Sequence, residues 1–286
     1  MELGIGLPNT VKGVSGQTTL EWARRADEGP FASVGVFDRL VYDSLDPLVT
    51  LAAVAGATRR VRLATTVVIG PLRNPVGLAK EAASLDVLSG GRLTLGLALG
   101  ARRDDYEAAG VPYAERGRRL DAQLRILRDT WEDGRIGPTP LQPNGPELIV
   151  GGLDDAAFAR AARYADGFVH NGGPPRIFAR SVDKALAAWQ DAGRPGRPRI
   201  WGMAYFALGD DEARAGHDYL LDYYAFTGPF AERIAAGLLT TPQAIIQHIR
   251  GYAEAGCDHL VLFPTSSAVD QLERLAQVVG THESST

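Results

Sequence analysis

The sequence predicts an α/β fold of the (β/α)8 TIM-barrel type, and three observations support this prediction. Short apolar runs rich in β-branched residues alternate with longer amphipathic stretches along nearly the whole chain. Eight such runs in 286 residues give 286/8, about 36 residues per unit, as eight strand and helix pairs in one barrel require. The runs, such as VGVF and LTLGLAL, are continuously apolar, which is typical of parallel strands covered by helices and argues against an antiparallel sandwich.

In chain order, the apolar runs predict strands over residues 3–7, 33–37, 61–68, 92–99, 147–150, 167–170, 199–208 and 259–263. The amphipathic stretches predict helices over residues 18–28, 47–58, 75–88, 113–131, 154–164, 174–192, 210–226, 242–255 and 269–279. Four of these helices begin at a proline, which is tolerated in the first helical turn. Asp154 is placed to cap another, because its carboxylate can accept hydrogen bonds from free backbone N–H groups.

Two segments interrupt this rhythm. Residues 133–146, DGRIGPTPLQPNGP, are rich in Pro and Gly and predict an irregular excursion before the fifth strand. Residues 209–258 form an insertion before the last strand, long for one crossover, with an aromatic-rich segment and a second short helix after Pro229. This insertion is predicted either to form a lid or to pack on the barrel or a partner subunit. We expect one domain over residues 1–280 and a flexible tail over 281–286.

Composition excludes several classes of protein. The formal charge of 30 − 34 = −4 gives no basic footprint for nucleic acid, and 45% hydrophobic residues exclude a disordered chain. The single Cys257 cannot form an intramolecular disulfide or a cysteine-based zinc site. No apolar run is long enough to span a membrane, and the first 20 residues lack the pattern of a secretion signal. We therefore expect a cytoplasmic enzyme or binding protein.

Familiar catalytic motifs are missing. The chain contains no P-loop, G-x-G-x-x-G turn, G-x-S-x-G elbow or H-E-x-x-H helix. Its five histidines are scattered without metal-ligand spacing, so no metal site is predicted. His170 differs from the others because it lies at the predicted carboxyl end of a strand, where barrel enzymes carry their reactive groups. We expect His170 either to line the site or to have a structural role.

The loops after the strands define the predicted active face of the barrel. Asp38 and Arg39 come after the second strand, and Gly100 to Asp105 come after the fourth. Gly151 and Gly152 precede a helix, and such turns expose backbone N–H groups that can bind an anion, a phosphate being the natural candidate. A Gly-Gly pair is also common in ordinary turns.

One long segment resembles a known family. The segment ATTVVIGPLRNP at 64–75, continuing as LAKEAASLDVLSGGRLTLG to Gly96, is similar to the central signature of the bacterial luciferase-like oxidoreductases. GVFDRL after the second strand and the glycines of residues 151–169 agree with it. The resemblance covers nearly the whole chain and implies a (β/α)8 barrel, commonly dimeric, that uses reduced FMN with oxygen or coenzyme F-420 for hydride transfer.

The resemblance also implies where a cofactor lies. It places the flavin or deazaflavin ring against Thr65, Thr66 and Val67, with a non-proline cis peptide at Thr66-Val67. It places the ribityl chain and phosphate near Gly100 to Asp104 and near Gly151, Gly152 and Leu153, with Arg102 and Arg103 as candidate charge partners.

Two departures from the family matter. Many members carry a histidine in the second-strand motif, where this chain has Asp38-Arg39. Arg39 cannot exchange protons near neutrality, but its charge can stabilise an anion, and Asp38 is expected either to orient it, to accept a ring N–H or to cap the loop. Luciferase holds the FMN phosphate with an arginine where this chain has Leu99, which weakens the case for FMN.

The sequence supports three hypotheses. The first is a luciferase-like monooxygenase that takes reduced FMN from a separate flavin reductase and oxidises a small organic substrate; the resemblance implies that it is a homodimer. The second is a hydride-transfer enzyme that uses coenzyme F-420, for which Asp38 and Leu99 argue. The third is a non-catalytic flavin-binding paralogue. The sequence does not specify the substrate.

Overall fold

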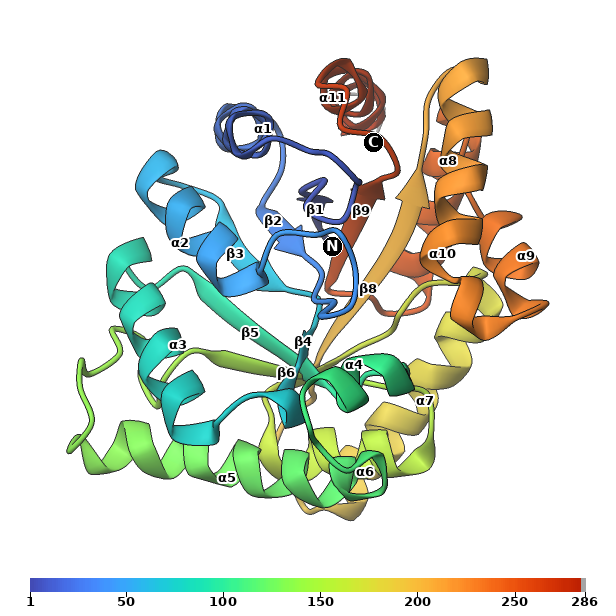
Figure 1. The fold of residues 1–286 in the computed structure, drawn as a ribbon. Coiled ribbons are helices and arrows are strands. Elements are labelled where there is room, and N and C mark those ends of the chain that lie inside the picture. The colour runs from blue at the N-terminus through green and yellow to red at the C-terminus, as the bar shows by residue number, and fades with distance from the viewer. Residues whose placement is uncertain (284–286) are drawn as a thin grey trace.

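The computed structural model describes residues 1–283, and their strands form one parallel sheet that closes on itself (Figure 1). The strand order is β3-β2-β1-β9-β8-β7-β6-β5-β4, and β3 also pairs with β5, which completes a ring of eight strands. The strands are β1 (Glu2–Gly6), β2 (Ser33–Val36), β3 (Arg62–Thr65), β4 (Val68–Ile69), β5 (Leu93–Ala98), β6 (Glu147–Gly151), β7 (Gly167–Val169), β8 (Arg199–Phe206) and β9 (His259–Pro264). The predicted TIM barrel is confirmed.

Helices surround this ring in the described part of the chain. They are α1 (Gly16–Glu28), α2 (Pro47–Ala57), α3 (Pro75–Ser89), α4 (Arg103–Ala108), α5 (Arg116–Asp133), α6 (Asp155–Tyr164), α7 (Pro175–Asp191), α8 (Asp210–Tyr223), α9 (Phe230–Ala235), α10 (Pro242–Glu254) and α11 (Asp270–Glu283). The capping role of Asp154 is confirmed, because its Oδ1 accepts from the Ala157 N–H at 2.8 Å. Single 3-10 turns stand at Gly70–Leu72, Tyr113–Glu115 and Ala225–Thr227.

Several elements differ from the prediction. The strand expected over 61–68 is divided into β3 and β4, because the chain leaves the regular ladder at Thr66 and Val67. The helix expected over 210–226 ends at Tyr223, and α4 was not predicted, since six residues are too few to show helical periodicity. Helix α11 continues to Glu283, past the predicted boundary at residue 280, and residues 284–286 lie outside the described part of the chain.

The interior of the barrel is apolar toward the carboxyl ends of the strands and polar at the opposite end. At the polar end, the fully buried His259 ring stacks on Trp201 with a centroid separation of 3.9 Å. Its Nε2 lies 2.6 Å from Ser33 Oγ and its Nδ1 lies 3.0 Å from Glu2 Oε2. Both ring nitrogens therefore have partners, and this network closes the bottom of the barrel.

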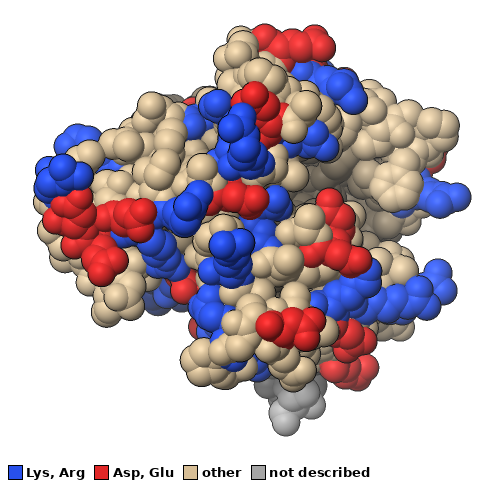
Figure 2. Space-filling model, turned by 90° about the horizontal axis from the view of Figure 1, so that it is seen from below, with Lys and Arg blue, Asp and Glu red and all other residues tan. Residues whose placement is uncertain are grey.

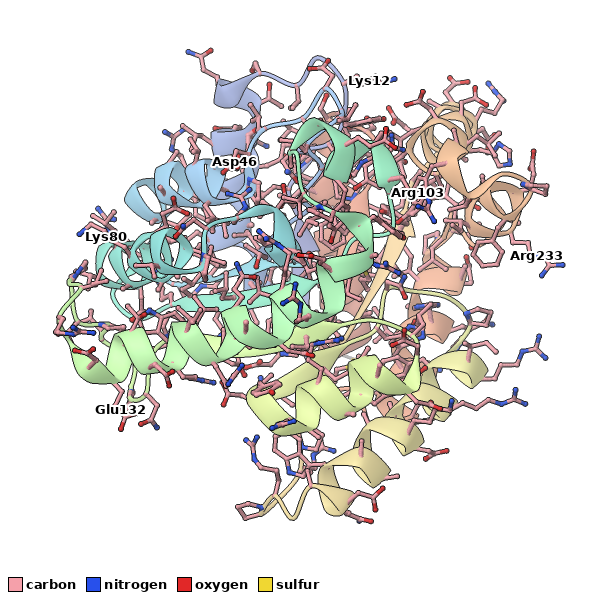
Figure 3. All side chains as sticks on the ribbon, turned by 60° about the horizontal axis from the view of Figure 1, so that its bottom comes forward. Lys12, Asp46, Lys80, Arg103, Glu132 and Arg233 are labelled. Carbon is pink, nitrogen blue, oxygen red and sulfur yellow. The ribbon has the colours of Figure 1, made fainter. Side chains whose placement is uncertain are left out.

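The outer surface carries charges of both signs. On the face shown in Figure 2, acidic and basic side chains are interspersed, in agreement with a formal charge of −4. Figure 3 shows Lys12, Lys80, Glu132 and Arg233 at the periphery, pointing away from the barrel. None of the helices over residues 1–283 combines the length and the apolar character needed to cross a bilayer.

Candidate active site

A cavity of about 360 Å³ opens where the strands end, between the barrel and the segment after α8. Its volume lies within the range of small-molecule sites, roughly 300–1,000 Å³. Among the predicted site residues, those that line it are Asp38, Arg39, Thr66, Val67, Leu99, Gly100, Arg102, Gly151, Gly152 and Leu153. Thr65, Arg103, Asp104 and His170 do not line it.

The floor of the cavity is the break between β3 and β4. The peptide bond Thr66-Val67 is cis, which confirms the prediction. The Thr65 hydroxyl replaces the missing strand pairing, since it donates to the Gly96 carbonyl at 2.8 Å and accepts from the Gly96 N–H at 2.8 Å. A Cβ at Gly96 would lie 2.1 Å from the Thr65 carbonyl oxygen, so only glycine fits there. Thr65 thus supports the floor from behind, and Thr66 and Val67 face the cavity.

Two glycine loops form one wall. Gly100 has φ +70°, and a Cβ there would lie 2.7 Å from Ile69 Cγ2. Gly152 has φ +157°, and a Cβ there would lie 2.4 Å from the Ala157 Cβ in α6. Because no side chain fits at either position, the backbone itself borders the cavity at these two places. Asp104 forms an ion pair with Arg102 instead of facing the cavity.

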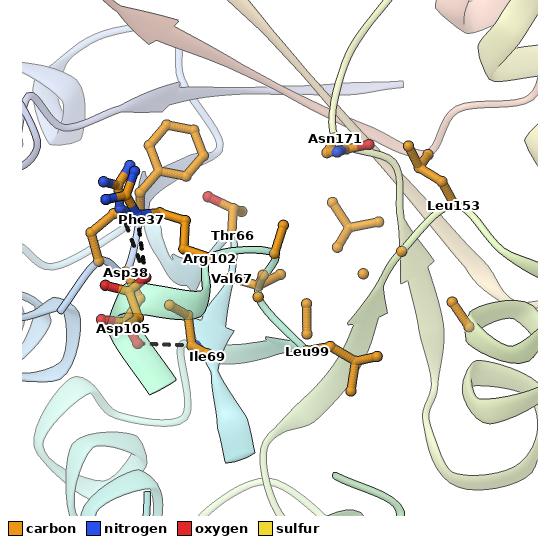
Figure 4. Close-up of a pocket in the computed structure, with 18 of the residues that line it drawn as sticks. Phe37, Asp38, Thr66, Val67, Ile69, Leu99, Arg102, Asp105, Leu153 and Asn171 are labelled. Carbon is orange, nitrogen blue, oxygen red and sulfur yellow. Dashed lines mark hydrogen bonds and ion pairs between the residues drawn. The ribbon is translucent and has the colours of Figure 1, made fainter. Parts of the chain in front are cut away.

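Asp38 holds β4 in place. Its Oδ2 accepts from the Ile69 N–H at 2.9 Å and lies 3.4 Å from Nη2 of Arg73, and its side chain is 8% exposed (Figure 4). Burial raises the pKa of the Asp38 carboxyl, and Arg73 opposes that effect. This geometry agrees with the alternative that Asp38 caps the loop. Among the described residues, no hydrogen bond joins Asp38 to Arg39.

Arg39 and Arg102 approach the cavity from two different loops. Arg39 Nη1 donates to the Tyr223 carbonyl at 3.0 Å, and its guanidinium lies 4.7 Å from the centroid of the Tyr223 ring. Arg39 Nε and Arg102 Nε lie 3.9 and 3.8 Å from the same oxygen, Oδ2 of Asp105. The Asp105 side chain is 1% exposed, and its other oxygen accepts from the Val41 N–H at 2.7 Å.

Aromatic side chains from the long insertion cover the cavity. Tyr223, Tyr224 and Phe226 line it, and the Tyr224 hydroxyl lies 2.9 Å from that of Tyr205 in β8. Burial raises the pKa values of the Tyr223 and Tyr224 phenols, so both stay neutral at pH 7. The insertion therefore agrees with both expectations: it packs on the barrel, and it also covers the cavity as a lid would.

His170 lies outside this cavity. Side chains alternate along a strand, so Val169 and Asn171 face the cavity and His170 between them points to the helix layer. Its ring packs against Phe178 at 5.6 Å, and burial lowers its pKa to about 4. Sequence reasoning missed Asn171 and Met203, although the alternation along β7 was a signal for the first.

The chain matches the model of the luciferase-like monooxygenase family over residues 1–256. The chain belongs to this family. An uncharacterized protein of Mycobacterium tuberculosis is 36% identical over 164 residues, which cover 52% of this chain and 56% of that protein. The chain thus spans only a little over half the length of such relatives.

Proteins whose names state an activity also match. The oxygenase component of a flavin-dependent trigonelline monooxygenase from Acinetobacter baylyi is 26% identical, with 75% of this chain and 70% of that protein covered. Monooxygenase RslO1 from Streptomyces bottropensis has the same fold, with a TM-score of 0.79, 22% identity, and 99% and 100% of the two chains covered. A structure of an F-420-dependent secondary alcohol dehydrogenase gives a TM-score of 0.82 at 17% identity, with 97% of each chain covered.

Proposed function

We propose that this protein is a monooxygenase that uses reduced FMN and oxygen on a small organic substrate. The supporting observation is that the cavity offers no free acid–base pair. Its three lining carboxylates, Asp38, Asp105 and Asp154, each accept a hydrogen bond from a backbone N–H, and no described lining residue is a histidine, cysteine or lysine. The chemistry must then come from a cofactor.

The cavity residues fit a flat, phosphorylated cofactor. Thr66 and Val67 form a floor, with Val169 and Met203 beside it, and the glycine backbones leave space where a Cβ would intrude. We propose that the ring lies on this floor and that the residues around Gly100 and Gly152 hold the ribityl chain and phosphate. When bound, reduced FMN supplies the electrons that activate oxygen.

The side chains then have supporting roles. Val67, Val169 and Met203 exclude water from one side, and the aromatic roof excludes it from the other. The neutral phenol of Tyr224 keeps its proton at the hydroxyl oxygen, which lies next to that of Tyr205. Arg39 keeps a fixed positive charge at the wall, which favours an anionic group nearby.

Equilibrium titration with oxidised FMN, reduced FMN and coenzyme F-420 tests the proposal, with ring absorbance and fluorescence as the signals. Tightest binding of reduced FMN supports it. Thr66→Trp should abolish that binding by filling the floor, whereas Thr139→Trp, on an exposed loop, should leave it unchanged. If Thr66→Trp binds and reacts like the parent protein, the ring does not lie on this floor.

Hydride transfer with coenzyme F-420 is the second candidate. Leu99 lines the cavity where luciferase carries its phosphate-binding arginine, and this apolar side chain favours a cofactor held differently from FMN. Tight binding of F-420 alone in the same titration would select this function. Binding of neither cofactor would leave a non-catalytic barrel as the best account.

We further propose two partners. The trigonelline enzyme is named as an oxygenase component, which supports a separate flavin reductase as the source of reduced FMN here. The second partner is another copy of this chain, because the family that the sequence resembles is commonly dimeric. Sedimentation tests this: a wild-type dimer supports the proposal, and a wild-type monomer would refute it.

A further inference from the structure

We infer that the cavity binds a small aromatic carboxylate whose carboxylate group is held by Arg39 and Arg102, here named the arginine pair. This inference deepens the proposed function by naming a substrate class, and it rests on that function for the oxidation of the bound acid but not for its binding. It starts from two arginines that line the cavity and share one buried carboxylate, while Nε of Arg39, Nε of Arg102 and Oδ2 of Asp105 have no hydrogen-bond partner. The two Nε groups lie toward Asp105, so the terminal Nη groups of the pair are the ones that can reach a ligand.

The arginine pair is built into the fold. The side chains of Arg39, Arg102 and Asp105 are 6%, 15% and 1% exposed. Arg39 and Arg102 come from the loops after β2 and β5, and Asp105 lies in the first turn of α4, so the barrel fixes their positions relative to one another. Each Nε stands more than 3.5 Å from Asp105 Oδ2, too far for a hydrogen bond, and burying such donors unsatisfied is costly.

The local charge favours an anion. Two largely buried guanidinium groups share the buried Asp105 carboxylate, and Arg102 also pairs with Asp104, whose side chain is 41% exposed. Arg39 is therefore the cation without a close carboxylate partner of its own, since Asp105 Oδ2 lies 3.9 Å from its Nε. Asp38 is engaged by Arg73 and the Ile69 N–H. A guanidinium has a planar fork of donors that matches a carboxylate, which makes this the natural ligand group.

The arginine pair lies in a different part of the cavity from the place proposed for the cofactor. Figure 4 shows Arg102 and Asp105 on one side, Leu153 and Asn171 on the other, and Thr66 with Val67 between them. We place the ribityl chain along the Gly100 loop and the phosphate at the Gly152 loop, which contains Leu153. A cofactor held in this way leaves the arginine pair free. The carboxylate of a second molecule can therefore occupy it.

The aromatic side chains that cover the cavity indicate that the bound acid is aromatic. Phe226 lies over both guanidinium groups, 5.8 Å from Arg39 and 5.0 Å from Arg102. Tyr223 and Tyr224 continue this aromatic surface along the cavity. Aromatic rings prefer offset or edge contacts with one another, so a planar substrate ring has matching surfaces next to its carboxylate.

Calorimetric titration with benzoate and phenylacetate, each compared with its neutral amide, tests the inference. The wild-type protein should bind each acid about tenfold or more tightly than the amide, because charge-assisted hydrogen bonds are strong. Arg102→Gln should remove most of that difference, because it weakens binding of the acids far more than binding of the amides. Arg103→Gln is the matched control, since Arg103 is exposed and stacks on Tyr113, and it should bind the acids like the wild type.

Arg39→Lys is a second variant that keeps the charge and removes the fork, and it should weaken acid binding severalfold if Arg39 takes part. Equal affinity of the wild type for acids and amides would overturn the inference. So would an Arg102→Gln protein that loses affinity for FMN but not for riboflavin, because the pair would then hold the cofactor phosphate. Failure of FMN to bind the wild type would refute the proposed function alone, since the acid and amide comparison does not require FMN.

Discussion

Acidification from pH 7 to pH 5 should destabilise the protein through its buried histidines. His170 is 1% exposed and neither ring nitrogen has a hydrogen-bond partner, and Nε2 of the partly buried His248 also lacks one. Burial lowers the pKa of each imidazole to about 4. In the unfolded chain both should titrate near the ordinary value of 6.5.

Proton linkage gives the sign and the size of this effect. Between pH 6.5 and 4 the unfolded state binds more protons than the folded state, so stability is complete above that range and is lost as the pH falls through it. For His170 the shift removes about 2 kcal/mol between pH 7 and pH 5. His248 should remove roughly half as much, because it is partly exposed.

Urea unfolding monitored by tryptophan fluorescence at pH 7 and pH 5 measures this loss. The difference in unfolding free energy between the two pH values should shrink by about 2 kcal/mol in His170→Gln relative to the wild type. His217→Gln is the control, because the His217 side chain is 43% exposed, and it should keep the wild-type difference. If His170→Gln also keeps it, burial does not lower the pKa of His170 and the reasoning is refuted.

Three further changes probe the floor and the bottom of the barrel. Gly96→Ala puts a methyl group 2.1 Å from the carbonyl oxygen of Thr65 in β3, and it should lower the free energy of unfolding in urea by about 3 kcal/mol or more. Gly56→Ala is the control, because Gly56 has open space around it, and it should be neutral or slightly stabilising. Ser33→Ala leaves Nε2 of buried His259 without its partner and should cost about 1–3 kcal/mol; an unchanged midpoint would show that this contact contributes nothing. Asp38→Ala should weaken both stability, by about 1–3 kcal/mol, and FMN affinity, and Asp38→Asn should retain more of each, since its amide oxygen can still accept the β4 N–H.

Much of the fold could be predicted because hydrophobic periodicity is local. Continuous apolar runs separated by helix-length stretches predicted the eight barrel positions, and Pro47, Pro75 and Asp154 marked helix starts, as the structure confirms. The break at Thr66-Val67 came from the family resemblance, since no propensity of those two residues indicates it. The site was harder to predict. Loop residues have no regular spacing of apolar and polar side chains from which the direction of a side chain could be read.

Two of the predicted site residues illustrate that limit. His170 was placed correctly at the end of β7, but the alternation of the strand turns it away from the cavity and turns Asn171 toward it. Arg39 was singled out by sequence, yet its relation to Asp105, much later in the chain, exists only because β2 and β5 end on the same face of the barrel.

By itself the sequence determined the strand and helix order, the closed parallel barrel and the face on which the loops gather, since these depend on the spacing of apolar side chains. Only the tertiary structure decided which loop side chains meet. The aromatic roof over the cavity and the arginine pair beneath it join segments that are distant in the chain, and packing between them is a property of the closed barrel as a whole.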